Sequence, residues 1–205
     1  MLYADISTSL DGRVTGPEPN PEQPLGAAGS RLHEWLYGLS GWRGPHRLDG
    51  GAQGPESELV AHSLDRAGAL VMGHTMYTLA DPHWAEEPPF HRPVFVLTHT
   101  PREPDVRRGT TFHFVTDGLR AAVESATAAA EGRDVSVGGG ADVIRQALAA
   151  GLLDELRLHI VPVLLGGGVQ LFGDPGPGPA EWQVVDTLRG ADAVHLTLRP
   201  ARTAD

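Results

Sequence analysis

The chain has 205 residues, of which 40% are hydrophobic, and this length and composition suit one compact domain with a full core. Its net charge of −10, from 26 acidic against 16 basic residues, argues against a protein that binds the phosphate backbone of nucleic acids. The absence of cysteine excludes disulfides, zinc–thiolate sites and cysteine nucleophiles. We find neither a signal peptide nor an apolar run long enough to span a membrane, so we expect a cytoplasmic protein.

The first third of the chain predicts one strand followed by two helices. The apolar run at 2–8 predicts the strand. Apolar residues at helical spacing predict a helix over 30–39, with Ser30 as its N-cap. The glycine-rich segment 40–56 predicts a long surface loop, and a second helix follows at 56–68.

The middle of the chain alternates short buried strands with helices. Strands are expected at 69–73, 93–99 and 110–117, because each is a short apolar or alternating run. A helix is expected to begin at 74, directly after the first of these strands. An alanine-rich segment predicts another helix over 118–132.

The last third predicts a strand at 133–138, a helix at 141–151, a strand at 154–166 and a hairpin at 182–200. Strands that alternate with helices and then follow one another indicate an α/β fold. We therefore expect a mostly parallel central sheet, flanked by helices, with an antiparallel C-terminal hairpin. No repeat or second domain is visible, so residues 1–205 are predicted to form a single domain.

The segment VSVGGGADVI at 135–144 predicts an anion site. Three glycines between a strand and a helix let the backbone approach a ligand, and the helix start offers unpaired N–H groups and a positive dipole end. A phosphate is the expected ligand, and a tight turn without a ligand is the alternative. The P-loop, the dinucleotide fingerprint and the nucleophile elbow are all absent. The ten histidines show no metal-binding spacing, so no metal is expected.

Four segments, SLDGRV, VMGHTMY, VLTHTPRE and VGGGADVI, each follow a predicted strand, at the edge where open α/β sheets bind ligands. With these motifs the chain resembles the dihydrofolate reductase-like superfamily over residues 2–199. It is most similar to stand-alone relatives of the C-terminal reductase domain of bifunctional riboflavin-biosynthesis deaminase-reductases. The run VGGGADVIRQALAAGLLDELRLHIVPVLLGGGVQLF carries most of this resemblance.

The resemblance implies an NADPH-dependent reductase that transfers hydride to a C=N or C=O carbon of a small heterocyclic or ribosylated substrate, as a 5-amino-6-(5-phosphoribosylamino)uracil reductase does. It also implies a homodimer, and partners limited to small molecules. The implied cofactor-binding residues are Ser7, Val14, Gly73, His74, Thr75, Met76, Thr98, His99, Arg102, Val137, Gly138, Gly139, Gly140, Ala141, Asp142, Val143 and Ile144. Dihydrofolate reductase and a non-catalytic nucleotide-binding regulator are the alternative functions.

Three positions depart from the family pattern. His74 stands where many relatives have arginine, so selection of NADPH over NADH rests on a weaker cation. Gly138 stands where the riboflavin-pathway reductases tend to carry a substrate-binding glutamate. Leu32 stands where dihydrofolate reductases hold the pterin with a carboxylate. The residues that usually bind the riboflavin-pathway substrate and the pterin are therefore both absent.

Four residues are candidates for the substrate side. Asp11 could relay a proton, or could be a turn residue bonded to its own backbone. His33 is the second catalytic candidate, because it neighbours the missing carboxylate position. Trp35 could stack on a substrate or belong to the core, and Trp84 could cover the pocket or merely close a loop.

Overall fold

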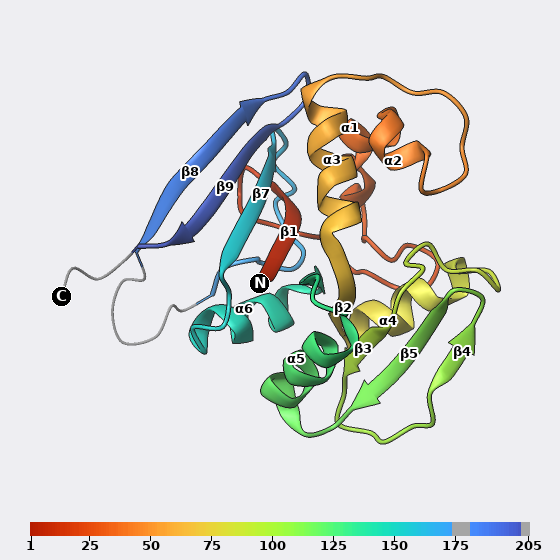
Figure 1. Cartoon of the computed structure of the whole chain (residues 1–205). Coiled ribbons are helices and arrows are strands. Elements are labelled where there is room, and N and C mark those ends of the chain that lie inside the picture. Colours follow the sequence, from red (N-terminus) through yellow and green to blue (C-terminus); the bar gives the residue numbers. More distant parts are fainter. Residues whose placement is uncertain (174–180, 202–205) are drawn as a thin grey trace.

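In the computed structural model, which describes residues 1–173 and 181–201, nine strands form one sheet in the order β4-β5-β3-β2-β6-β1-β7-β9-β8 (Figure 1). The strands are β1 Leu2–Ser9, β2 Ala67–Gly73, β3 Val94–Leu97, β4 Asp105–Arg107, β5 Thr110–Val115, β6 Asp134–Gly139, β7 Glu155–Val161, β8 Trp182–Arg189 and β9 Val194–Pro200. The strands from β5 to β7 in this order are mutually parallel. β4 and the β8–β9 hairpin add antiparallel edges. The predicted α/β sheet with its antiparallel C-terminal hairpin is confirmed.

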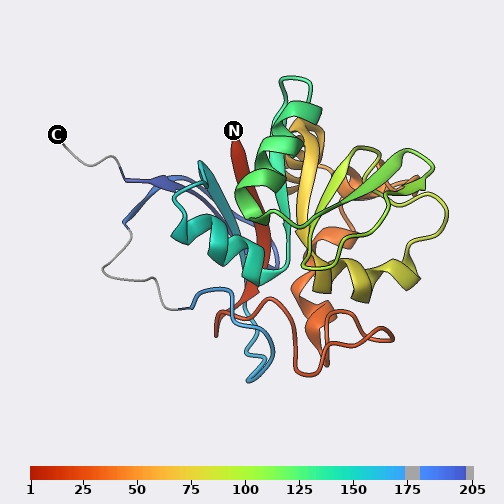
Figure 2. The ribbon, with the colours of Figure 1, turned by 90° about the horizontal axis from the view of Figure 1, so that it is seen from below.

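Helices cover both faces of the sheet (Figure 2). They are the 3-10 helices η1 Gly29–Leu32 and η2 Asp81–His83, and the α-helices α1 Glu34–Tyr37, α2 Ser40–Arg43, α3 Pro55–Arg66, α4 His74–Ala80, α5 Gly118–Ala129 and α6 Ala141–Ala149. The apolar sides of α5 and α6 pack on one face, in the largest core cluster. Helices α1, α3 and α4 pack on the other face, in two smaller clusters.

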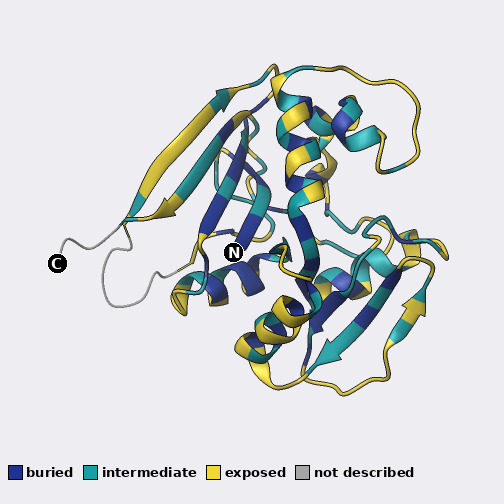
Figure 3. Ribbon diagram, in the orientation of Figure 1, coloured by how far each residue is buried: buried dark blue, intermediate teal, exposed yellow. Residues whose placement is uncertain are grey.

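The alternation of side chains along β1 gives these two faces different chemistry. Leu2 and Ala4 point into the core under α5 and α6. Tyr3, Asp5 and Ser7 point to the opposite face, where they line a cavity beside α3 and α1. At the far edge of the sheet, β8 exposes most of its residues (Figure 3). None of the helices within 1–173 and 181–201 is long and apolar enough to cross a membrane.

The single helix predicted over 30–39 is wrong. The segment forms η1 and α1, which are interrupted at His33 with φ −120°. Ala28, not Ser30, precedes the first turn, and no side chain caps it. The break lets the indole N–H of Trp35 donate to both Ser7 Oγ and the Leu32 carbonyl, each at 3.1 Å. These tertiary contacts override the helical spacing.

Two further expectations need correction. The segment predicted as loop 40–56 contains α2, which packs closely on α3: a Cβ at Gly41 would lie 2.0 Å from the Ser57 carbonyl oxygen. The strand predicted over 154–166 ends at Val161, and the segment after it turns to pair with the loop after β1. The short edge strand β4 was not predicted at all.

Candidate active site

The glycine loop connects two neighbouring strand ends. β6 ends at Gly139 and α6 begins at Ala141, while the adjacent β2 ends at Gly73 and α4 begins directly after it. A Cβ at Gly73 would lie 3.1 Å from Val143 Cγ2, and one at Gly139 would lie 2.9 Å from Met76 Sδ. The two strand-to-helix junctions are therefore packed against each other, and only small residues fit between them.

Two helix starts consequently lie together at one edge of the sheet. The first N–H groups of a helix have no partner within the helix, and they carry its positive dipole end. This brings the predicted residues 73–76 and 137–144 into one place, as the sequence suggested. The carboxylate of Asp142 is bonded to Gln146 Nε2 at 2.6 Å, one turn further along α6.

The predicted adenosine-side residues follow β3, the next strand along the edge. Thr98 is buried, and its hydroxyl accepts a hydrogen bond from the Thr100 N–H at 3.2 Å. His99 is exposed. The exposed Arg102 places its guanidinium 4.8 Å from the centre of the Phe114 ring. A cation and hydroxyl groups therefore stand beside the two helix starts, and this set of donors fits a dinucleotide phosphate group.

A cavity of about 360 Å³ lies next to the glycine loop, on the face of the sheet to which Tyr3, Asp5 and Ser7 point. Gly138 and Ser7 line it, and so do two of the predicted substrate-side residues, His33 and Trp35. Apolar side chains of α3 and of the segment before β3 form much of its wall. They include Leu59, Leu64 and Phe90. This volume suits a small ring system, and the cavity joins the predicted cofactor edge to the predicted substrate side.

Asp5 and His159 form the polar floor of this cavity, and sequence reasoning missed both. His159 Nε2 lies 2.5 Å from Asp5 Oδ1, and the Ser63 hydroxyl donates to Asp5 Oδ2. Burial alone would raise the pKa of Asp5, but attraction to His159 and the hydrogen bonds from His159 and Ser63 outweigh it and lower this pKa to about 2. Asp5 is therefore ionised throughout the neutral range.

His33 is a buried neutral histidine at the cavity wall. Burial, with a further contribution from nearby His159, lowers its pKa to about 4. Within the described part of the chain, its buried Nδ1 meets no hydrogen-bond partner. The ring can thus offer a hydrogen bond to a ligand, but it carries no charge at neutral pH. Its catalytic role stays a prediction.

Trp35 belongs to the core and also lines the cavity. Its ring centre lies 4.8 Å from that of His159 and 4.7 Å from that of His195. The indole N–H is already bonded to Ser7, so only the ring itself can meet a substrate.

In the structure, Asp11 anchors a loop through hydrogen bonds. Its carboxylate accepts hydrogen bonds from the Ser9 hydroxyl at 2.6 Å and from the N–H groups of Leu165 and Gly166 at 3.0 and 2.8 Å. These bonds, the one from Ser9 first, lower its pKa to about 2. Asp11 does not line the cavity, and its oxygens are occupied, so the geometry favours loop anchoring over the predicted proton relay. Val14, buried nearby, bonds through its N–H to the Val169 carbonyl at 2.9 Å.

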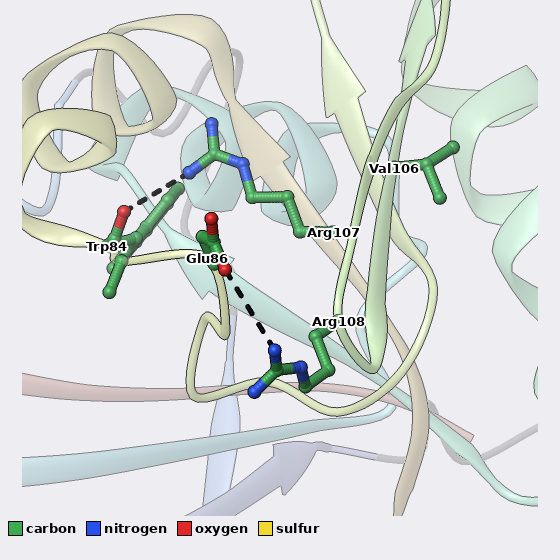
Figure 4. A pocket seen from close by; sticks show the side chains of 6 residues that line it. Trp84, Glu86, Val106, Arg107 and Arg108 are labelled. Carbon is green, nitrogen blue, oxygen red and sulfur yellow. Dashed lines mark hydrogen bonds and ion pairs between the residues drawn. The ribbon is translucent and has the colours of Figure 1, made fainter.

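Trp84 lies away from this cavity. Its ring stacks on Phe112 at 5.3 Å, and it borders a separate open depression of about 510 Å³ beside β4 (Figure 4). There Arg107 donates to the Trp84 carbonyl and Arg108 pairs with Glu86 (Figure 4). The predicted substrate role of Trp84 is not supported by this placement. Nowhere in the described ranges do three or more histidine or acidic side chains gather as a metal-binding group.

A mostly parallel sheet with a glycine-lined edge and an adjoining cavity defines a class: an α/β domain built to bind a nucleotide beside a small substrate. The chain belongs to the RibD C-terminal domain family, whose sequence model matches residues 1–196. Membership of this family makes it a reductase domain, as the resemblance implied. A search of curated proteins gives no match.

Solved structures share this fold. A putative riboflavin biosynthesis protein from Shewanella sp. PV-4 matches with a TM-score of 0.70 at 22% identity, over 98% of this chain and 99% of the other. RibD from Acinetobacter baumannii gives 0.60 at 16%, over 98% and 58%. A diaminohydroxyphosphoribosylaminopyrimidine deaminase/5-amino-6-(5-phosphoribosylamino)uracil reductase from Thermotoga maritima gives 0.59 at 12%, over 98% and 56%. The chain thus spans little more than half of the last two proteins.

Proposed function

We propose that this chain is an NADPH-dependent reductase of the riboflavin-pathway type, which reduces a C=N or C=O carbon of a small ribosylated or heterocyclic ring compound. The observation that carries the proposal is the cavity that is lined both by Gly138 of the glycine loop and by Ser7 of β1. Bound there, NADPH would supply the hydride. Residues 73–76 and 138–144 would hold its phosphates with backbone N–H groups, and Thr98, His99 and Arg102 would hold its adenosine side.

The chain's own contribution is to orient the reactants and exclude water. The apolar wall and the ring of Trp35 suit a flat ring system, while Asp5, His159 and Ser136 offer polar groups at the floor. Arg92 also lines the cavity, but its guanidinium is bonded to the carbonyls of Phe90, Leu64 and Ala67. The cavity therefore holds few groups for a substrate phosphate.

The substrate proposal predicts a marked preference for ribosylaminouracil compounds over dihydrofolate. Leu32, which replaces the pterin-binding carboxylate, is fully buried in an apolar cluster. We expect NADPH oxidation with 5-amino-6-(5-phosphoribosylamino)uracil or its dephosphorylated form, and turnover of dihydrofolate far below the usual enzyme range of about 1–1000 per second. Steady-state absorbance assays measure all three.

Each result of this assay has a distinct meaning. Robust turnover at micromolar dihydrofolate would favour the dihydrofolate reductase alternative. NADPH binding without oxidation of any of the three compounds would favour the nucleotide-binding regulator.

His74 should make cofactor choice depend on pH. It is exposed at the start of α4, where a 2′-phosphate would lie if the resemblance holds. A protonated imidazole attracts that phosphate, and NADH has none, so the NADPH-to-NADH affinity ratio should rise as pH falls from about 8 to about 5.5. Calorimetric titrations measure the ratio, and His74→Ala should flatten it. A ratio that is flat in the unmodified protein would rule out this contact.

We further propose a cytoplasmic homodimer. β8 is an edge strand that exposes Val184 and Val185, at 59% and 47%. An apolar edge strand of this kind readily pairs with another chain.

A further inference from the structure

A buried row of four titratable side chains runs beneath the cavity, on the face of the sheet that α3 covers, from α3 across β9 and β7 to β1. Glu56 Oε1 lies 3.0 Å from His195 Nε2, and His195 Nδ1 lies 2.8 Å from His159 Nδ1. His159 Nε2 then lies 2.5 Å from Asp5 Oδ1. Both histidines are almost fully buried, at 2% and 4% exposed. β7 and β9 hold them directly opposite each other in antiparallel register.

The number of protons in this row follows from its geometry. Each of its three hydrogen bonds needs one proton between the two facing atoms. Without that proton, two ring nitrogens, or a ring nitrogen and a carboxylate oxygen, would face each other with lone pairs that repel. Two neutral histidines that each donate through Nε2 would leave two bare Nδ1 atoms 2.8 Å apart. The row therefore holds one proton more than two neutral imidazoles and two carboxylates can carry. That proton can reside on either ring.

The surroundings favour His159 as the charged ring. Burial lowers the pKa of His195, and the proximity of His159 lowers it further, although Glu56 opposes both effects. His159 instead bonds the ionised Asp5. The other ionisable groups around Asp5 are Arg157, paired with it in register on β7, Tyr3 on β1 and His33 at the cavity wall.

The two ends of the row differ in what they meet. The Asp5 side chain is 20% exposed and lines the cavity. A carboxylate has about four acceptor positions, and His159 and Ser63 occupy two of those of Asp5. The Glu56 side chain is 19% exposed at the start of α3, where its second oxygen accepts from the Ala191 N–H at 3.1 Å. One end thus opens to a substrate and the other reaches the protein surface.

We propose that this row is the proton supply of the reductase: His159 is the proton source, Asp5 is the carboxylate that passes the proton to the substrate, and His195 and Glu56 are positioning residues that hold His159 in its protonated form. The proposal rests on the proposed function. As hydride reaches the substrate carbon, the π electrons of the C=N or C=O bond move to the nitrogen or oxygen. Asp5, a carboxylate, takes the proton from His159 Nε2 and passes it to that atom, so Asp5 is again a carboxylate when the step ends and His159 is left neutral. His159 keeps its Nδ1 proton in the hydrogen bond to His195, so the proton lost from Nε2 is replaced from solvent that enters the cavity once the product has left.

Nuclear magnetic resonance of the histidine rings tests the row without any substrate. His159 and His195 should lose their shared proton in one coupled step. Glu56→Gln should lower the pH of that step by about one unit or more for both rings, because a nearby negative charge is removed. Gly190→Ala should act similarly, since a Cβ there would lie 1.9 Å from Glu56 Oε1 and displace it.

Matched controls are available on the same helix and among the other rings. Glu58→Gln removes an equal charge from an exposed position of α3, and it should leave both rings unchanged. The ring of His46, which bonds the Trp42 carbonyl outside the row, should titrate alike in every variant. Independent titration of His159 and His195, or a response of His195 alone to Glu56→Gln, would overturn the row.

Kinetic measurements with 5-amino-6-(5-phosphoribosylamino)uracil then test whether the row supplies protons during reduction. Asp5→Asn should lower kcat by about 10²- to 10⁴-fold with NADPH affinity unchanged. Glu56→Gln should shift the pH dependence of kcat in the same direction as the ring titration, and Glu58→Gln should not. A kcat within twofold of normal in Asp5→Asn would overturn the proton supply. Absence of turnover in the unmodified protein would instead refute the proposed function and the delivery step together, while the resonance experiment still decides the row.

Discussion

Replacing Gly139 by valine should weaken NADPH binding by about tenfold or more. Gly139 has φ +126°, a conformation that side chains with a Cβ rarely adopt. A Cβ there would lie 2.9 Å from Met76 Sδ, so a branched side chain must displace the Met76 side chain in the first turn of α4 as well as strain the loop backbone. The N–H groups of the two helix starts would then no longer converge on one phosphate. Titration calorimetry measures the affinity.

Gly38→Val is the matched control for this substitution. Gly38 has φ −84°, and a Cβ there would meet nothing within 4 Å. The control should bind NADPH as the unmodified protein does. Equal affinities of Gly139→Val and Gly38→Val, with both proteins folded by circular dichroism, would remove the glycine loop from the cofactor site.

Replacing Glu155 by alanine should lower the free energy of unfolding by about 3–5 kcal/mol. Glu155 is 2% exposed and accepts hydrogen bonds from three guanidinium groups: Arg66 at 2.6 Å, Arg157 at 3.0 Å and Arg199 at 2.9 Å. Arg66 and Arg157 are themselves largely buried, so the substitution leaves Arg157 without this carboxylate and leaves Arg66 with Asp134 but without Glu155. Urea unfolding at neutral pH measures the loss.

The same carboxylate links stability to pH. Burial would raise the pKa of Glu155, but the hydrogen bonds from Arg66 and Arg199 outweigh it, so its pKa is lowered. Its contribution is therefore complete above the ordinary glutamate range and declines as pH falls below it. Glu155→Ala should accordingly lose its disadvantage at acid pH. The exposed Glu124→Ala on α5 should change stability little at any pH, and an equal loss in both variants would contradict this account.

The fold and the position of the glycine loop at the sheet edge could be predicted because their signals are local. Alternating apolar segments specify the sheet, and three glycines before a helix specify the junction at Gly139. The prediction of a single helix over 30–39 was wrong because Trp35 is positioned by Ser7, a residue far away in the sequence. The residues at the floor of the cavity were missed for a related reason: Asp5, His159 and Glu56 come together only after β1, β7 and α3 are packed together. The available signal was the acidic and basic residues within the strand segments LYADIST and ELRLHIV: Asp5 in the first, and His159 with Glu155 and Arg157 in the second.

The anchoring role of Asp11 has a consequence for how this edge of the protein opens. Asp11 holds the N–H groups of Leu165 and Gly166, and further backbone bonds join Val14 to Val169 and Leu171 to Gly12. The two loops, about 150 residues apart in sequence, therefore share one set of hydrogen bonds. Segments linked in this way unfold locally as a single cooperative unit. The glycine-rich turn at 166–168 is thus no independent flap: it can lift only when the loop after β1 lifts with it.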